Sequence, residues 1–243
     1  MLTEPTTEKL KAMRLEGMMA AWREQQTQTQ IASLSFDERL GLLVDAEWLH
    51  RENARVGRAL REAKLKMPSA CIEDIDYPAK RELDKAVVRQ LASCRWVQEH
   101  QAILITGATG TGKSYVACAM AQQACRKGFR AIYRRASRLF EELALARADG
   151  TYPRALARFA RFNVLVVDDF AISPVTDMQR TDLLELLEDR YGARATIVTS
   201  QLEPSLWHDY HYCGMELRRR GLPARRCRSI APGSRLHPIH SLR

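Results

Sequence analysis

A short motif from Gly107 to Ser114 has the residue types and the spacing needed to hold the phosphates of a nucleotide. It fits the pattern GxxxxGK[ST] at every fixed position. The glycines let the backbone curl so that N–H groups point at phosphate oxygens, and the helix expected after them adds its positive N-terminal end. Lys113 supplies a full charge at the β- and γ-phosphates, and Ser114 presents a hydroxyl to Mg²⁺. The motif therefore predicts a site for ATP and Mg²⁺, formed by Gly107, Ala108, Thr109, Gly110, Thr111, Gly112, Lys113, Ser114 and Tyr115.

Two aspartates further along the chain have the chemistry that such a site requires. The apolar segment 164–167 has the length of a buried strand, and Asp168 and Asp169 follow it directly. Parallel α/β sheets place their ligands at the carboxyl ends of strands. We expect Asp168 to hold Mg²⁺, directly or through water, and Asp169 to orient or deprotonate the attacking water. A pair of aspartates is also a common loop feature, but its position after a phosphate-binding motif favours the catalytic interpretation.

A third polar position follows the next expected strand, residues 196–199. Ser200 and Gln201 come directly after that strand, which would place a polar side chain between the phosphate loop and the acidic strand. Gln201 or Thr199 could there sense the γ-phosphate, and we name Gln201 as a catalytic candidate together with Lys113 and Asp169. The alternative is that these polar residues only end the strand.

The elements that position these residues alternate between strands and helices. Strands are expected at 102–106, 129–133, 164–168 and 196–199, with helices at 113–127, 136–148, 153–161 and 177–191. This order predicts an α/β fold with a parallel sheet covered on both faces by helices. Apolar residues before it recur at helical spacing. We therefore predict four regions: a helical N-terminal domain (1–66), a connector with a helix at 80–99 (67–100), an ATPase core (101–210) and an atypical basic tail (211–243).

The composition and charge narrow the class of protein. No apolar run approaches the about 20 residues that span a bilayer, and the N-terminus lacks the apolar region of a signal peptide. The six cysteines show no metal-ligand spacing, so we expect reduced thiols in a cytoplasmic protein without a membrane partner. The net charge of +9 is weak support for nucleic-acid binding, because residues 211–243 contain eight arginines against one glutamate.

Several further segments occur in order with these motifs. They are Cys71–Asp76, Tyr133–Arg135, Leu139–Leu143, Glu188–Tyr191, Thr199–Leu202 and Trp207–Tyr210. Together with the helical N-terminus, the set resembles the IstB family of transposition helper ATPases, which are related to the DnaC helicase loaders within the AAA+ superfamily. The resemblance covers about residues 1–210.

The resemblance implies a P-loop AAA+ core and an ATPase that assembles on duplex DNA as an oligomer, a ring or a helical filament. Such a helper marks target DNA and stimulates or directs its partner transposase. The nearest alternative is a DnaC-like replicative helicase loader with the same core. An ATP- and DNA-binding scaffold without hydrolysis is another, and a metabolic P-loop kinase is a weaker third because no acceptor pocket is recognisable.

The tail departs from the family pattern after Tyr210. Family members continue with segments that supply an arginine finger to the neighbouring subunit, and no such segment is recognisable in 211–243. Crowding of arginine, proline, cysteine and histidine is typical of a GC-rich gene translated out of frame, so we hypothesise a frameshift near the codon of Tyr210. Translating the other two frames downstream tests this idea. We therefore expect retained ATP binding with weak hydrolysis.

Three groups of arginines are candidates for contacts with DNA phosphates. The first group shares one helical face at spacing i, i+4, i+7, the second follows a strand, and the third again has helical spacing. The candidates are Arg51, Arg55, Arg58, Arg134, Arg135, Arg154 and Arg158. Such stripes would neutralise phosphates without reading base sequence. A solvated surface, or a contact with a partner protein, is the alternative for each group.

Overall fold

The computed structural model of the chain describes residues 3–28, 31, 33–77, 83–170, 175–202 and 227–230. The chain forms two compact units, which divide between Arg58 and Ala59 inside a long helix. The first unit thus ends before the predicted domain boundary at residue 66. The physical reason is that Ala63 and Leu65 are buried in the core of the second unit.

The first unit consists of α1 (Thr3–Ala12), α2 (Glu16–Thr27) and the greater part of α3 (Phe36–Ala63). The start of α3 is encoded locally. The Glu38 backbone N–H donates to Ser35 Oγ at 3.3 Å, and the Ser35 backbone N–H donates to the Glu38 carboxylate at 2.8 Å. This reciprocal pair is a capping box, which satisfies N–H groups that have no partner inside the helix.

The contact between α2 and α3 depends on one glycine and one carboxylate. A Cβ added to Gly17 would lie 2.6 Å from His50 Cβ and 2.7 Å from the Ala46 carbonyl oxygen, so only glycine allows this approach. The Met18 backbone N–H donates to the buried Glu47 carboxylate at 3.0 Å. Glu47 on α3 therefore caps the N-terminus of α2, where a negative charge is favoured by the helix dipole.

The second unit is built on a sheet of five strands in the order β2-β3-β4-β1-β5, in which all neighbours are parallel. The strands are β1 (Ala102–Thr106), β2 (Ala131–Arg135), β3 (Val164–Phe170), β4 (Ala195–Ser200) and β5 (Cys227–Ile230). β5 belongs to the tail, and it pairs with β1. The remaining tail residues and the segment 207–210 lie outside the described residues.

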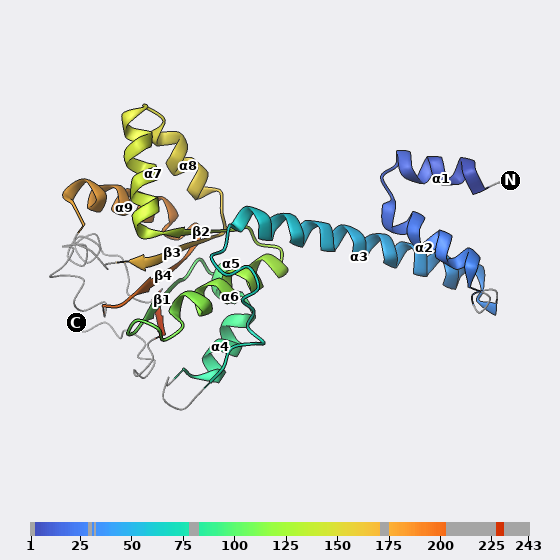
Figure 1. The fold of residues 1–243 in the computed structure, drawn as a ribbon, viewed down its shortest axis with the longest axis horizontal. Helices are drawn as coiled ribbons and strands as arrows, with labels where there is room; N and C mark the ends of the chain where they lie inside the picture. The colour runs from blue at the N-terminus through green and yellow to red at the C-terminus, as the bar shows by residue number, and fades with distance from the viewer. Residues whose placement is uncertain are drawn as a thin grey trace. The chain divides into compact units, whose positions relative to one another are not determined.

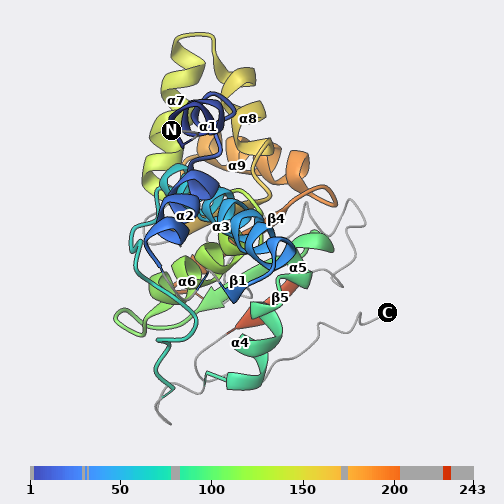
Figure 2. The same cartoon turned by 90° about the vertical axis from the view of Figure 1, so that its right-hand side faces the viewer.

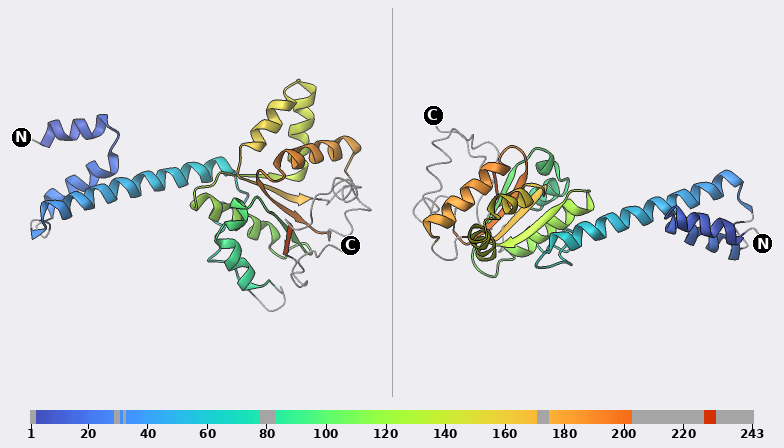
Figure 3. Two further views of the ribbon diagram at one scale, coloured as in Figure 1. Left: turned by 180° about the vertical axis from the view of Figure 1, so that it is seen from behind. Right: turned by 90° about the horizontal axis from the view of Figure 1, so that it is seen from above.

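Helices cover both faces of this sheet (Figure 1), and Figure 2 and Figure 3 present the same layers from other sides. One layer contains α4 (Lys85–Ala92), α5 (Arg95–Gln98) and α6 (Lys113–Arg126). The other contains α7 (Ala136–Ala148), α8 (Tyr152–Ala160) and α9 (Asp177–Arg190). Successive strand residues point to opposite faces: Val164 and Val166 pack in the core cluster with α6, and Leu165 and Val167 pack in the cluster with α7.

The predicted helix at 80–99 is wrong as a single element. The structure divides the described part into α4 and α5, and Cys94 lies between them with a φ of 60°. A residue in the left-handed region ends a helix, because its backbone cannot continue the right-handed turn. The other helices and the strands β1 to β4 agree with their predicted positions, with bounds that differ by a few residues.

Candidate functional site

The phosphate-binding motif forms the turn between the end of β1 and the start of α6. Gly110 and Gly112 have φ angles of 81° and 90°, which are rarely adopted by residues with side chains. Nothing lies within 4 Å of a Cβ built at Gly110, so its backbone conformation, and not space, requires glycine there. The loop thereby brings the N-terminus of α6, whose first N–H groups have no partner inside the helix, to the carboxyl end of the sheet.

Lys113 is the first residue of α6 and is buried at the base of the loop. Its Nζ donates to the Ala108 carbonyl oxygen at 2.7 Å, so the lysine closes the loop onto itself. Burial lowers the pKa of Lys113, while the nearby Asp169 and Asp168 act in the opposite direction. The ammonium group has one carbonyl partner, which leaves further N–H donors for phosphate oxygens.

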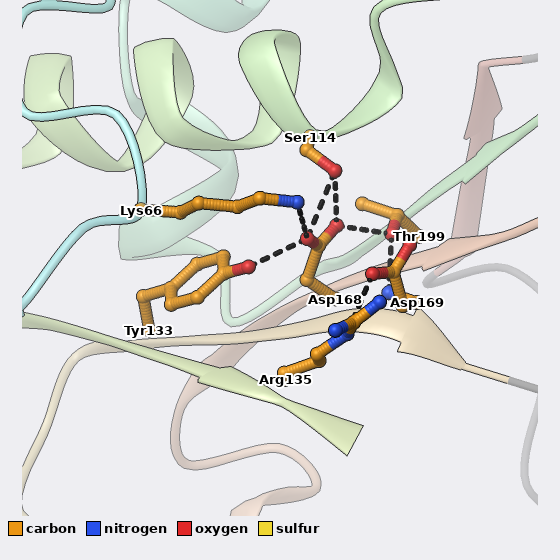
Figure 4. Close-up of polar contacts among 7 residues, drawn as sticks. All are labelled: Lys66, Ser114, Tyr133, Arg135, Asp168, Asp169 and Thr199. Atoms are coloured by element: carbon orange, nitrogen blue, oxygen red, sulfur yellow. Dashed lines mark hydrogen bonds and ion pairs between the residues drawn. The ribbon is translucent and has the colours of Figure 1, made fainter. Parts of the chain in front are cut away.

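Asp168 is the centre of the site (Figure 4) and its side chain is fully buried. Ser114 Oγ lies 2.9 and 2.8 Å from the two carboxylate oxygens. The Tyr133 hydroxyl donates to Oδ2 at 2.6 Å, and the Thr199 hydroxyl donates to Oδ1 at 2.6 Å. Lys66 Nζ lies 3.7 Å from Oδ2. Residues from four separate segments therefore converge on one carboxylate.

The charge of Asp168 is stabilised despite its burial. Burial by itself raises the pKa of this carboxyl, but the hydrogen bonds from Thr199, Tyr133 and Ser114 and the charge of Lys66 outweigh it, and the pKa lies below its usual value. An ionised carboxylate beside a serine hydroxyl provides the hard oxygen ligands that Mg²⁺ prefers, together with phosphate oxygens. The residues present therefore fit the predicted magnesium site.

Asp169 follows directly and is held by two contacts of its own. Its backbone N–H donates to Thr199 Oγ1 at 2.9 Å, and its carboxylate lies 2.8 Å from Arg135 Nε. Its φ of 58° lies in the left-handed region, so the chain turns sharply between the two aspartates. This turn gives the two carboxylates separate partners. Arg135, a predicted DNA contact, lies here at the end of β2.

Thr199 and Gln201 have different surroundings. Thr199 is fully buried on β4, and its hydroxyl bridges Asp168 and the backbone of Asp169. Gln201 follows the end of β4 and is exposed. The structure thus brings Thr199 into the acidic cluster, whereas the catalytic role of Gln201 stays a prediction.

A pocket of about 170 Å³ lies beside the phosphate loop. Thr111, Lys113 and Tyr115 line it from the motif and α6, and Asp76 and Leu83 line it from the connector. Tyr115 was predicted to contact the nucleotide, and its place in this lining is consistent with that role. Ala108 and Thr109 are exposed at the tip of the loop.

Sequence reasoning did not find Lys66 or Tyr133 as site residues. Tyr133 lies on β2 in register with Val166, and Arg135 lies in register with Asp168. The neighbouring strand order β2-β3 would have placed Tyr133 near the aspartate, but that order was not predicted. Lys66 lies three residues after the end of α3, and no local pattern indicates which element such a residue contacts.

The predicted DNA-contacting arginines are mostly paired with carboxylates. Arg134 Nε lies 2.6 Å from Glu142, and Arg158 NH2 lies 2.5 Å from the same carboxylate. In the first unit, the side chain of Arg51 lies 2.6 Å from Glu47, and Arg55 pairs with Glu52. Arg58 and Arg154 are exposed. The positions of these side chains do not test whether they contact DNA, so the assignment of the seven arginines to DNA stays a prediction.

The described ranges of the chain contain neither a membrane-spanning helix nor a protein metal cluster. In that part of the chain, no helix is long and apolar enough to cross a membrane. Nor do three or more histidine, cysteine, aspartate or glutamate side chains there come together as a metal cluster. A phosphate-bound Mg²⁺ does not need such a cluster, because one or two protein ligands complete its shell.

Comparison with known proteins agrees with this geometry. Residues 8–214 match the family described as IstB-like ATP binding protein. The chain is 45% identical over 205 residues to the ATP-binding protein of insertion sequence IS1162 from Pseudomonas fluorescens, covering 84% of this chain and 89% of that protein. It is 43% identical over 209 residues to an insertion sequence ATP-binding protein of Sinorhizobium fredii, covering 86% of this chain and 85% of that protein.

Solved structures with a similar fold share little sequence with the chain. The AMPPCP-bound DnaA from Aquifex aeolicus has a TM-score of 0.57 at 17% identity over 70% of this chain, which spans only 51% of that protein. The DnaC helicase loader has a TM-score of 0.54 at 18% identity, covering 67% of this chain and 96% of that one. At these identities the likeness shows the fold alone, a P-loop AAA+ core.

Proposed function

The chain belongs to the family of IstB-like ATP-binding proteins, and from this premise we propose that it hydrolyses ATP with Mg²⁺ as a helper in DNA transposition. The observation that carries the catalytic part is the meeting of Ser114 and the buried Asp168 carboxylate at 2.8 Å beneath the phosphate loop. The names of the relatives, which are ATP-binding proteins of insertion sequences, support the part in transposition.

Each residue of the site has a distinct part in the proposed reaction. Lys113 and the N–H groups at the start of α6 bind the β- and γ-phosphates, while Ser114 and Asp168 would hold Mg²⁺. When bound, Mg²⁺ neutralises charge that develops on the phosphate oxygens. Asp169 orients the attacking water and accepts its proton at a carboxylate oxygen. Thr199 and Arg135 fix the backbone and the carboxylate of Asp169 in position for that role.

We expect the isolated chain to turn over slowly. In phosphoryl transfer an arginine finger contributes roughly 10³–10⁵ in rate, and the proposed function places that arginine on a neighbouring subunit. The segment that would supply it was not recognisable in the sequence, and most of the tail lies outside the described residues. Self-assembly into a ring or filament is part of the proposal, because the catalytic arginine acts between subunits.

Duplex DNA and a transposase are the proposed macromolecular partners. Exposed Arg58 and Arg154 are available for phosphate oxygens, and Arg51, Arg55 and Arg158 would exchange a carboxylate partner for a phosphate. Contacts of this kind are independent of base sequence and weaken as salt rises. Arg58→Gln and Arg154→Gln should each lower the slope of log affinity against log salt by about one. An unchanged slope would remove that arginine from the interface.

The chief alternative is a helicase loader with the same fold. The likeness to the DnaC helicase loader is one of fold, whereas the two relatives above 40% identity are named for insertion sequences. Sequence identity above 40% is more specific than a shared fold, so we favour a function in transposition. A pull-down with an insertion-sequence transposase, compared with one using a replicative helicase, tests this choice.

The deciding experiment is ATP hydrolysis by the purified chain with and without duplex DNA, with Lys113→Ala as the blank. DNA-stimulated turnover above that blank supports the proposed function. ATP binding without turnover in any oligomeric form would instead identify an ATP-binding scaffold. Absence of Lys113-dependent ATP binding would contradict the proposal as a whole.

A further inference from the structure

Lys66 lies outside both sequence motifs and yet reaches the carboxylate of Asp168. Its Nζ lies 3.7 Å from Oδ2, and its side chain is 48% exposed, whereas that of Asp168 is fully buried. Figure 4 shows Lys66 and Thr199 on opposite sides of the carboxylate. Lys66 therefore approaches from a segment that takes no part in the phosphate loop.

The backbone around Lys66 is held in place on both sides. Lys64 has a φ of 49°, which ends α3, and the next residue, Leu65, is buried in the core cluster. Met67 packs against the same cluster. Just before the turn, Glu62 on α3 pairs with Arg130, which precedes β2, with its Oε2 3.0 Å from Arg130 Nε. The turn thus places the Lys66 backbone, and its side chain extends to Asp168.

The contribution of Lys66 to the site is its charge. Asp168 already accepts hydrogen bonds from three hydroxyls, and a distance of 3.7 Å is too long for a fourth. The other cations near the acids have different partners: Lys113 Nζ donates to a carbonyl oxygen, and Arg135 pairs with Asp169. Among the described residues, Lys66 is the cation whose charged group lies within 4 Å of the Asp168 carboxylate.

We propose that Lys66 is a built-in counter-charge of Asp168 that sets how strongly nucleotide binding depends on Mg²⁺. The inference rests on the proposed function, because it assumes that this site binds a Mg²⁺-nucleotide. A lysine charge beside Asp168 repels an arriving divalent cation and attracts the phosphates of a metal-free nucleotide. Both effects reduce the difference in affinity between the two forms of the nucleotide.

The test measures the dissociation constant of a fluorescent, non-hydrolysable ATP analogue with saturating Mg²⁺ and in EDTA. The ratio of the EDTA value to the Mg²⁺ value reports the dependence on the metal without any turnover. Lys66→Met should raise this ratio about three- to tenfold, a range expected for a half-exposed charge beside the metal. Lys66→Arg, which keeps the charge, should leave the ratio near that of the wild type.

Lys64→Met is the matched control. Lys64 is exposed and lies two residues before Lys66, so the change removes the same charge at a different place. Its ratio should equal that of the wild type, and an equal rise in both variants would overturn the inference. A wild-type ratio in Lys66→Met would also overturn it, provided that circular dichroism shows the variant folded. If Lys66→Met does not fold, Lys66→Gln takes its place in the same measurement. If the wild type binds no nucleotide, the proposed function fails first, and this inference fails with it.

Discussion

Asp168 and Glu47 are both buried carboxylates, one in each unit, and their surroundings differ in kind. Asp168 is contacted by three side-chain hydroxyls and a lysine from four distant segments. Glu47 accepts from the Met18 backbone N–H and pairs with Arg51 on its own helix. Hydroxyls can rotate toward a metal or a phosphate, whereas a backbone N–H at a helix start is fixed. The difference indicates a ligand site in one case and a structural cap in the other.

The largest expected effect tests whether Asp168 belongs to a ligand site, and it is a loss of ATP turnover in variants of Asp168 and Asp169. Asp169→Asn should lower turnover about 10²–10⁴-fold by removing the proton acceptor, with little change in nucleotide affinity. Asp168→Asn should weaken Mg²⁺-dependent nucleotide binding as well, because it removes the charge that attracts the metal. Single-turnover hydrolysis and equilibrium binding on the same preparations separate the two outcomes. An equal loss of affinity in both variants would contradict the assigned roles.

A slightly smaller effect is expected at Arg190, which is fully buried at the end of α9. Its NH1 donates to the Phe159 and Phe162 carbonyl oxygens at 2.7 and 3.1 Å, and its NH2 donates to that of Ala195 at 2.5 Å. Arg190→Met removes all of these buried hydrogen bonds at once, so the free energy of unfolding of the second unit should fall by about 3 kcal/mol. Urea denaturation measures this change.

The control for Arg190 is Arg138→Met, which removes an exposed arginine of α7 paired with Glu141. That change should stay within about 0.5 kcal/mol. A loss at Arg138 as large as that at Arg190 would show that burial of the hydrogen bonds is not the cause.

The next prediction concerns the packing of the first unit at Gly17. Gly17→Ala places a Cβ 2.6 Å from His50 Cβ, so we expect a loss of about 1–3 kcal/mol in the stability of the first unit. Gly41→Ala on α3 is the matched control: nothing lies within 4 Å of its Cβ, and it should stabilise the helix by up to about 1 kcal/mol. Amide hydrogen exchange in α2 and in the part of α3 before Arg58 follows this unit. Equal effects of both changes would contradict the close contact.

The pH dependence of the first unit should follow Glu47. Burial alone raises the pKa of this carboxyl, but the hydrogen bonds from Arg51 and the Met18 backbone N–H outweigh it, and the pKa lies below its ordinary value of 4.5. A lowered folded-state pKa means that the stabilisation is fully present above that ordinary value and is lost as pH falls through the folded-state pKa. Denaturation midpoints between pH 7 and pH 3 should show this loss, and Glu47→Gln should lessen it.

The smallest effect is expected on the outer surface of α3. Trp48 is 74% exposed, so Trp48→Ala should change the free energy of unfolding by no more than about 0.5 kcal/mol. Denaturation of the two proteins at equal concentration measures this. A loss of several kcal/mol in the free energy of unfolding would show that the Trp48 side chain is buried in solution and not exposed.

The sequence predicted those parts of the site that neighbouring residues encode. The phosphate loop, its glycines and the strand before Asp168 are contiguous, so each could be interpreted from local chemistry. Ser114 and Asp168 were each expected to hold Mg²⁺, and the structure places the serine hydroxyl 2.8 Å from the carboxylate.

The parts that could not be predicted depend on tertiary packing. Lys66 and Tyr133 join the site through the end of α3 and the order of β2 and β3, neither of which has a local signal. Arg135 was assigned to DNA by its charge, yet it pairs with Asp169. The break at Cys94 lies in a segment with helical apolar spacing, and only the backbone angle reveals it.

The division between the units inside α3 has a consequence for local unfolding. Hydrogen bonds in the helix before Arg58 should open when the first unit melts, while those near Ala63 should stay closed as long as the sheet is intact. Amide hydrogen exchange should therefore show a step in protection along one uninterrupted helix, between residues 58 and 59. A single protection level along α3 would mean that the two units unfold as one cooperative body.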